Sequence, residues 1–494
     1  MISLALLAGL VYTPNAYATD AEVGGYMRIS TRPDFQGGDG KLGYWNLHGR
    51  LLNETTWAAI ETRISLLDEI PDTDRDWAAI HARVEGGSVL NGDSNAGVLS
   101  AMRLSQLYAL IGNPTRKGLE WQVGTLQHWT GDLGLYDMRP DSLFEESVGG
   151  AVHYRGDKLT WMIAAGDAGY GLDPTHYNTV FSGGGRVRWH VADGLEIGAG
   201  FEGRYEPAFP GNTQAPYATP DLDFESWIRG EVVSNFVAEN PNQELLFPKP
   251  EERDAQSWKA TGYIGFGGFG PLVWNSFYVR MEQGHPESES IEQYNGQDYT
   301  LYLTDLTDER STLLLGNEMS LRLIPERLDA VWALLVGQHK DGDNTIAPTS
   351  QVREYASTVL RLQTYLTPTI HWIFENSLAV EHSPNGNAFR GHVDSIFASN
   401  DGFSDSRGLE FGDTDTRKTW QGKTGLVLNP LGPGVYVRPS IRLLYGLQYS
   451  TQHAAWGGSF VDTLDQYGDF YSGKGNLSDR LWHQVIALEA EAWF

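Results

Sequence analysis

The chain has 494 residues, with 63 acidic and 36 basic side chains and a formal net charge of −27. This acidic balance argues against a nucleic-acid partner, since nucleic-acid binding needs a basic surface. The absence of cysteine excludes disulfides, thiolate metal sites and thiol catalysis. Glycine and the aromatic residues are spread from end to end without a linker-like tract, so the composition favours one large domain.

The first residues predict a secretory signal. Ile2 to Tyr12 form an apolar run, and Ala16-Tyr17-Ala18 follow as a small-x-small cleavage pattern. We therefore expect residues 1–18 to be a signal peptide and residues 19–494 to be one mature domain. No other apolar run approaches the ~20 residues that a membrane helix needs. A periplasmic protein, a released protein and an outer-membrane barrel remain as alternatives.

Strand-like alternation recurs along the chain. The segment from Trp77 to Glu85 places Ile80, Ala82 and Val84 on one face and polar or charged residues on the other. Two further pairs of alternating segments are joined by short turns, at 186–191 with 195–205 and at 313–323 with 328–336. Such hairpins have one apolar and one wet face.

The connectors fall into two kinds. Short turns are expected at 192–194, 324–327, 367–368 and 429–434, and long polar loops at 30–44, 206–223, 240–257, 284–300, 338–352, 383–417 and 452–479. Short and long connections of this kind are typical of transmembrane barrels with short periplasmic turns and long external loops. The acidic loop segment Asp341-Gly342-Asp343 is interpreted as solvated loop surface, with an incidental Ca²⁺ site as the alternative.

The last strand predicts closure of a barrel. Leu488, Ala490, Ala492 and Phe494 fall on one face, and Trp493 falls on the other face with two glutamates. A soluble sandwich or propeller could also alternate, but no blade-length repeat is visible. We therefore expect a transmembrane antiparallel β-barrel in the outer membrane, in contact with its lipid.

Several motifs resemble the maltoporin family of sugar-specific outer-membrane channels, in the same order along the chain. They are Gly25-Tyr26-Met27-Arg28, Arg50-Leu51-Leu52-Asn53-Glu54, Gly131-Asp132-Leu133-Gly134-Leu135-Tyr136-Asp137, Thr367-Pro368, Val437-Arg438-Pro439-Ser440-Ile441-Arg442 and Trp493-Phe494. The middle, about 206–330, aligns poorly. The resemblance implies an all-β barrel of about 18 strands, a homotrimer, and a third loop that folds inward and narrows each pore.

The resemblance also implies an aromatic track for an oligosaccharide substrate. The matching residues are Tyr26, Trp57, Phe269, Tyr436 and Trp493. Sugar rings present C–H faces that slide on aromatic rings. Interfacial belt packing is the alternative for each ring.

Polar groups beside the track would bind sugar hydroxyls. Arg28, Arg50, Arg103, Asp132 and Asp137 match polar residues of the family's lumen or constriction loop. Arg438 belongs to the matched late-strand motif. Guanidinium groups donate and carboxylates accept, which suits adjacent hydroxyls. The alternative is a row of ion pairs that only screens charge along the wall.

The sequence departs from the family at the constriction. Thr130 stands where the family has an arginine, and Arg139 stands where it has a tyrosine. The 86–99 loop also lacks the tryptophan that the family contributes to a neighbouring subunit. Arg139 at the narrowest point would favour anionic sugars.

The expected function is a saccharide-selective diffusion channel. A non-selective porin, or a receptor or polysaccharide-anchoring barrel, are the alternatives. No enzyme is expected, because the 13 histidines are scattered and neither a Gly-x-Ser-x-Gly elbow nor a His-Glu-x-x-His motif occurs. No cofactor or metal site is expected. His81, His153 and His190 are interpreted as polar groups of the lumen wall.

Overall fold

A computed structural model describes most of the chain between Asp20 and Phe494. The described residues are 20–33, 42, 45–54, 56–69, 73–87, 102–145, 147–168, 179–207, 255–284, 290–294, 297–301, 310–340, 352–382, 416–451 and 481–494. The predicted signal peptide and Asp341-Gly342-Asp343 lie outside these residues, as does most of the 86–99 loop.

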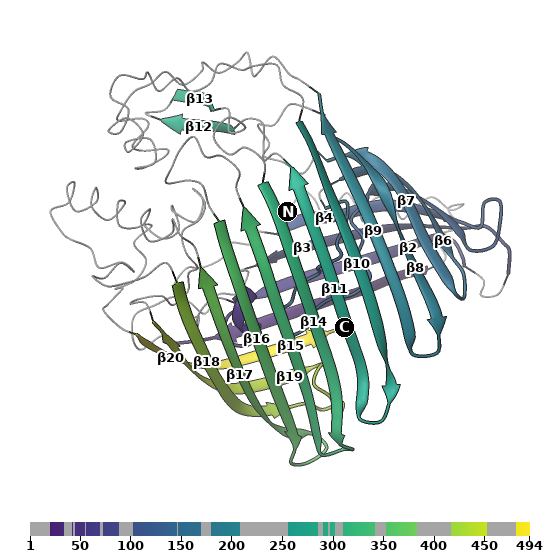
Figure 1. Ribbon diagram of the computed structural model, residues 1–494. Helices are drawn as coiled ribbons and strands as arrows, with labels where there is room; N and C mark the ends of the chain where they lie inside the picture. The colour runs from purple at the N-terminus through teal and green to yellow at the C-terminus, as the bar shows by residue number, and fades with distance from the viewer. Residues whose placement is uncertain are drawn as a thin grey trace, which may run out of the picture.

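Eighteen antiparallel strands form one closed barrel (Figure 1). They are β1 (Asp20–Thr31), β2 (Trp57–Leu67), β3 (Trp77–Gly87), β4 (Arg103–Gly112), β5 (Leu119–Thr125), β6 (Val148–Arg155), β7 (Leu159–Asp167), β8 (Phe181–Ala192), β9 (Leu195–Glu206), β10 (Ala255–Phe269), β11 (Leu272–Gly284), β14 (Arg310–Ile324), β15 (Leu328–Lys340), β16 (Val352–Tyr365), β17 (Ile370–His382), β18 (Thr416–Leu428), β19 (Ser440–Ser450) and β20 (Trp482–Trp493). Each strand pairs with its neighbour in sequence, and the predicted fold class and strand number are confirmed.

Two small elements are not part of the barrel wall. The hairpin of β12 (Ser290–Tyr294) and β13 (Gln297–Leu301) forms a separate two-stranded sheet. A single helical turn, α2 (Trp45–His48), lies between β1 and β2. No helix in the described part of the chain is long and apolar enough to span a membrane.

The barrel closes between its first and last strands. Tyr26 pairs with Trp493, and Arg28 pairs with Glu491. The backbone amide of Gly25 donates to the Phe494 carbonyl at 2.8 Å, and the Phe494 amide donates back at 3.1 Å. The predicted role of the last strand in closure is therefore confirmed.

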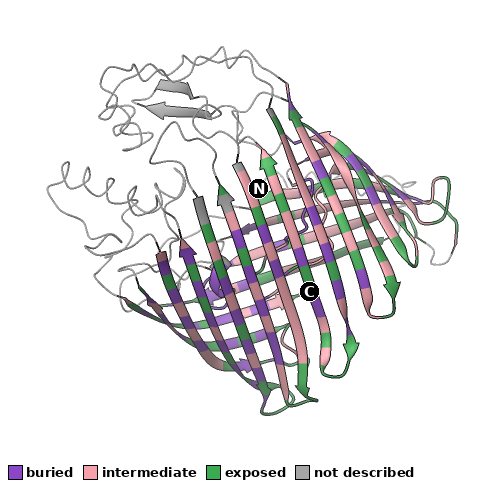
Figure 2. Cartoon of the chain, viewed as in Figure 1, coloured by how far each residue is buried: buried purple, intermediate pink, exposed green. Residues whose placement is uncertain are grey.

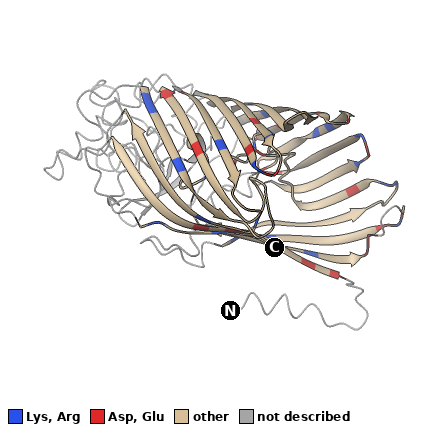
Figure 3. Ribbon diagram, turned by 90° about the horizontal axis from the view of Figure 1, so that it is seen from below, with Lys and Arg blue, Asp and Glu red and all other residues tan. Residues whose placement is uncertain are grey.

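The outer face of the barrel is apolar. On β19 and β20, Ile441, Leu443, Ile486 and Leu488 are exposed, while the residues between them are buried. Figure 2 shows the resulting alternation of buried and exposed positions along the strands, and in Figure 3 most positions along the strands are neither Lys or Arg nor Asp or Glu. A closed barrel with an apolar outer face is the strand architecture that satisfies all backbone groups in lipid. The protein is an outer-membrane β-barrel.

Turn chemistry explains the short connections. Gly194 has a φ of 73° in the two-residue turn between β8 and β9, and Glu326 has a φ of 59° between β14 and β15. Short hairpins need such left-handed residues because their twist must match that of the strands. The predicted short turns at 192–194, 324–327 and 367–368 are confirmed, whereas the turn predicted at 429–434 is part of a longer connection that spans 429–439.

Candidate functional site

Two connections fold into the barrel. Loop 1 is the connection from β1 to β2 (32–56), and loop 3 is the connection from β5 to β6 (126–147). Leu47 of loop 1 and Leu133, Leu135 and Tyr136 of loop 3 form one buried cluster with inward-facing residues of the wall. These wall residues are Tyr263, Tyr278, Leu314, Val331, Ala333, Leu335, Val359 and Ala379. The inward-folded third loop that the resemblance implied is therefore present.

A second apolar cluster fills the neighbouring part of the lumen. Leu42, Leu51 and Leu52 of loop 1 are almost fully buried against β17 to β20. Their partners on the wall are Ile373, Val427, Leu444, Val485 and Ala487. Together the two clusters extend over β10, β11 and β14–β20. A third cluster packs Leu126, Leu143 and Phe144 of loop 3 against β6 and β7.

Wall carboxylates fix the path of loop 3. Glu318 on β14 accepts a hydrogen bond from the Leu135 amide at 2.8 Å, and Glu202 on β9 accepts one from the Phe144 amide at 2.6 Å. Asp141 accepts the Thr130 amide at 3.0 Å within the loop. These buried carboxylates satisfy backbone donors that would otherwise be unpaired in the lumen.

A buried ionic network joins loop 1 to the closing strand. Glu491 contacts Arg50 at 2.8 Å, Arg438 at 2.5 Å and also Arg442. The Tyr26 hydroxyl donates to Glu491 at 2.9 Å. Each of these charges is buried and has several partners, which is the arrangement that a low-dielectric interior requires.

The network extends to loop 3. Glu54 pairs with Arg28 and, at 3.2 Å, with Arg50, while Arg50 also lies 3.8 Å from Asp137. Five of the predicted site residues thus come together here, namely Tyr26, Arg28, Arg50, Asp137 and Arg438. Their polar groups bind one another, which matches the ion-pair alternative.

The remaining predicted aromatic residues are dispersed. Tyr436 donates to Glu318 at 2.6 Å and lies against Gly134 of loop 3. Trp493 is 66% exposed, and its ring packs edge-on against Tyr26 with centroids 6.0 Å apart. Trp57 is paired with Arg28, and this register places it on the same inward face.

Phe269 departs from its expected position. It ends β10 at the turn to β11, is 59% exposed, and stacks on Phe266 with ring centroids 6.5 Å apart. Phe266 alternates with the inward-facing Tyr263 and Gly265, so the stacked pair belongs to the outer surface. The positive φ of Gly268, 83°, interrupts the strand alternation just before Phe269. This geometry corrects the expectation of a lumen ring and matches the interfacial alternative.

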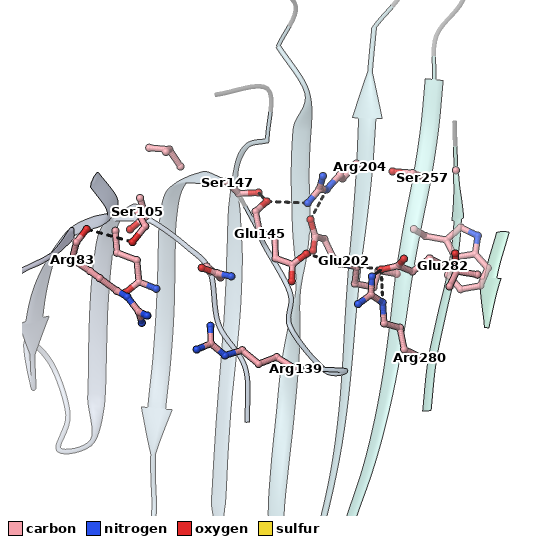
Figure 4. A pocket seen from close by; sticks show the side chains of 18 of the residues that line it. Arg83, Ser105, Arg139, Glu145, Ser147, Glu202, Arg204, Ser257, Arg280 and Glu282 are labelled. Atoms are coloured by element: carbon pink, nitrogen blue, oxygen red, sulfur yellow. Dashed lines mark hydrogen bonds and ion pairs between the residues drawn. The ribbon is translucent and has the colours of Figure 1, made fainter. Parts of the chain in front are cut away.

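The lumen holds an upper cavity of about 700 Å³ (Figure 4). It lies near the external ends of β3, β4 and β11 and is bordered by loop 3. Its charged lining comprises Arg83, Glu85, Arg103, Arg139, Glu145, Glu202, Arg204, Lys259, Arg280 and Glu282. Of the predicted site residues, this cavity contains Arg103 and Arg139. Asp132 is exposed on loop 3 but does not line it.

A lower cavity of about 190 Å³ lies nearer the short turns. It is lined by Gln106, Tyr108, Leu110, Glu120, Gln122, Gln127, His128, Trp129, His153 and Arg155. Gln106 and Gln127 line both cavities, so the two cavities are neighbours beside loop 3, and we call the boundary between them the junction.

Arg139 and Trp129 stand at this junction. Arg139 lines the upper cavity and Trp129 lines the lower one, with the guanidinium carbon 3.9 Å from the indole centroid. Burial lowers the pKa of Arg139, and the neighbouring Arg83 lowers it further. An arginine nevertheless stays charged at neutral pH. The structure thus places Arg139 at the junction of the two cavities.

A polar cluster beside the junction attaches loop 3 to the wall. Arg186 on β8 binds Asp141 at 2.6 Å and donates to the His128 ring at 2.8 Å. Burial and the Arg186 charge lower the pKa of His128 to about 3, so this imidazole is neutral. His81 and His153 lie on the inward face, and His190 lies 3.2 Å from Glu196.

The sequence did not single out Trp129, Gln106 or Gln127. Trp129 lies two residues before the Gly131–Asp137 motif, and this closeness to the predicted constriction loop could have identified it as a site residue. No sequence signal identified Gln106 and Gln127, because their place in both cavities depends on where loop 3 packs. Among the described residues, no group of three or more His, Asp or Glu side chains could hold a metal ion.

Comparison with known proteins supports no assignment beyond the fold. No protein-family model matches the sequence, and no curated protein is similar enough to be a relative. Similar solved structures include the outer-membrane channel DcaP of Acinetobacter baumannii, with 10% identity and a TM-score of 0.42 over 74% of this chain and 92% of that one. OprD of Pseudomonas aeruginosa has 8% identity and a TM-score of 0.41 over 97% of this chain and 95% of that one. Wzi of Escherichia coli, a carbohydrate-binding barrel, has 13% identity and a TM-score of 0.37 over 98% of this chain and 87% of that one. These low values identify neither a family nor a substrate, and maltoporin membership remains a resemblance.

Proposed function

We propose that the protein is a diffusion channel that passes saccharides through an off-centre pore on the β3–β11 side. The observation that carries this proposal is that the upper and lower cavities are neighbours and share Gln106 and Gln127 in their linings. A polar path beside a packed loop offers a route across the barrel. Neither catalysis nor a bound cofactor is needed for this role.

The lining of the lower cavity supports a sugar as solute. Tyr108 and Trp129 supply aromatic faces, while Gln122 and Gln127 supply amide donors and acceptors. Stacking on each ring contributes on the order of 1 kcal/mol. Weak, repeated contacts of this size suit transit, because a tight site would hold the solute.

The aromatic path proposed here differs from the one that the sequence indicated. Trp129 and Tyr108 replace Tyr436 and Phe269, which lie against loop 3 and at the outer surface. Trp493 and Tyr26 remain at the closing strand, where Trp493 is available at the end of the barrel.

Planar-bilayer recordings of the purified protein test the proposal. We expect steady ion conductance that a neutral oligosaccharide blocks in a saturable manner. Steady conductance without saturable block would favour the non-selective porin. Absence of conductance in a folded barrel would favour the receptor or anchoring alternative.

We also propose a homotrimer, as the family resemblance implies. Light scattering of the detergent-solubilised protein should give three times the protomer mass. Insertions into a bilayer should then show three equal conductance steps, whereas single steps from a particle of protomer mass would refute the trimer.

A further inference from the structure

The upper cavity carries positive charge in an acidic protein. Its described lining contains six cations and four carboxylates, a difference of two positive charges, although the whole chain has a net charge of −27. The cations are Arg83, Arg103, Arg139, Arg204, Lys259 and Arg280, and the carboxylates are Glu85, Glu145, Glu202 and Glu282. The charge is unevenly divided between the two sides of the cavity.

The charges on the β9–β11 side satisfy one another. Arg204 binds Glu202 at 2.6 Å, and Arg280 binds Glu282 at 2.6 Å. Lys259 lies 3.0 Å from Glu282 and also contacts Glu145 of loop 3. Three cations face three carboxylates here, and Figure 4 shows the contacts that join them. This side presents little unbalanced charge to a solute.

Among the lining residues, the opposite side has three cations, Arg83, Arg103 and Arg139, and one carboxylate, Glu85. Asp132 and Asp137 of loop 3 also act on the Arg139 charge, but they do not line the cavity. Arg83 is paired with Glu61 at 3.0 Å and Glu85 at 2.8 Å. Within the part of the chain that the structure describes, neither Arg103 nor Arg139 has a carboxylate at ion-pair distance. Arg103 is exposed, and Arg139 rests one face on Trp129 while its side chain extends into the cavity (Figure 4).

We infer that the upper cavity selects solutes that carry a carboxylate, which Arg103 and Arg139 bind on the way to the junction. The inference rests on the proposed channel function and names the substrate class of that channel. Guanidinium forks match carboxylate geometry and form charge-assisted hydrogen bonds. Ser105, Gln106 and Gln127 line the same space and offer neutral partners for hydroxyls.

A carboxylate fits this site better than a doubly charged phosphate. Transit requires that the solute leave as readily as it enters. The two arginines attract a solute with a single negative charge only moderately. The carboxylates on the β9–β11 side are already paired with cations. The carboxylate could belong to an acidic saccharide or to a simple organic acid, so the experiment separates these sources.

The test compares three trisaccharides as blockers of the wild-type channel in planar bilayers. They are the trisaccharide of galacturonate, the methyl ester of that trisaccharide, and the trisaccharide of neutral galactose. We expect galacturonate to block at a roughly tenfold lower concentration than the other two, the factor that one charge-assisted hydrogen bond provides. Equal block by all three would overturn the inference while leaving the saccharide channel intact. Block by succinate but by no sugar would support carboxylate selection and refute saccharide transport.

Variants locate the site. Arg103→Gln and Arg139→Gln should each remove most of the preference for galacturonate and shift the reversal potential toward cation selectivity. Arg63→Gln is the matched control, because Arg63 carries the same charge on the wall, is paired with Glu69 at 3.2 Å, and lines neither cavity. A preference retained in both cavity variants would overturn the assignment. Should a variant fail to fold, the wild-type comparison with the methyl ester still decides.

Discussion

The guanidinium of Arg139 lies over the indole of Trp129, 3.9 Å from its centroid, and the two side chains face different cavities. A cation over an aromatic face is attracted by the ring quadrupole, and the attraction is stronger where water is excluded. Both residues belong to loop 3, so the pair stabilises the conformation of the loop between the two cavities.

Trp129→Ala should release Arg139 and widen the junction. The lost cation–π contact costs about 1 kcal/mol, and the missing ring opens the lower cavity. Single-channel conductance and current noise should both rise. Trp121→Ala is the control, since Trp121 lies on β5 directly before loop 3 and its outward-facing ring is 52% exposed. Unchanged conductance in Trp129→Ala would contradict this account of the junction.

Glu491→Gln should destabilise the closed barrel strongly. The variant leaves Arg50, Arg438 and Arg442 with reduced compensation in a buried site. Breaking a buried ionic network of this kind costs about 3–5 kcal/mol. The midpoint of urea unfolding, followed by electrophoretic mobility of the folded barrel, measures the loss.

A matched exposed carboxylate provides the comparison. Glu69 pairs with Arg63 at 3.2 Å and is half exposed. Its replacement by glutamine should cost less than about 1 kcal/mol, as for other surface ion pairs. Equal losses in Glu491→Gln and Glu69→Gln would show that the network contributes nothing special to closure.

The sequence predicted the barrel because lipid imposes a period-two pattern on every strand. The stretch Leu488 to Phe494 already separated its lipid face from its wet face, and the register of Tyr26 with Trp493 follows from closure. The location of the two cavities was not predictable in this way. It depends on which wall loops 1 and 3 cover, and such packing joins residues far apart in sequence.

One signal for that packing was present in β15. Its inward residues Val331, Ala333 and Leu335 are as apolar as the outward ones, which is unexpected for a wall that faces water. The apolar inner face indicates that a loop covers it. By contrast, most charged residues of the predicted site resembled family positions, yet Arg28, Arg50 and Arg438 pair with Glu54 and Glu491 in the buried network.

Gly316→Val should displace loop 3. A Cβ at this position would lie 2.6 Å from a methyl carbon of Leu133, so the loop must move. Overpacking of this kind costs roughly 1–3 kcal/mol. Conductance and protease sensitivity within loop 3 should increase. Gly150→Val is the control, because a Cβ there would lie 3.8 Å from its nearest neighbour, the backbone oxygen of Gln122, and its conductance should match the wild type. An undisturbed loop 3 in Gly316→Val would show that the Leu133 contact does not position it.

Acidification should loosen loop 3 through His128. Burial and Arg186 lower the pKa of this imidazole from 6.5 to about 3. A base with a lowered pKa stabilises the docked loop fully above its ordinary pKa of 6.5, and that stabilisation is lost progressively as the pH falls from 6.5 toward 3. Current noise from loop motion should therefore rise as the pH is lowered from 7 to 4, because a single buried imidazole becomes protonated. His128→Asn keeps an acceptor for Arg186 but does not titrate, so its noise should change less over this range. If both proteins respond to pH alike, His128 is not the group that holds the loop.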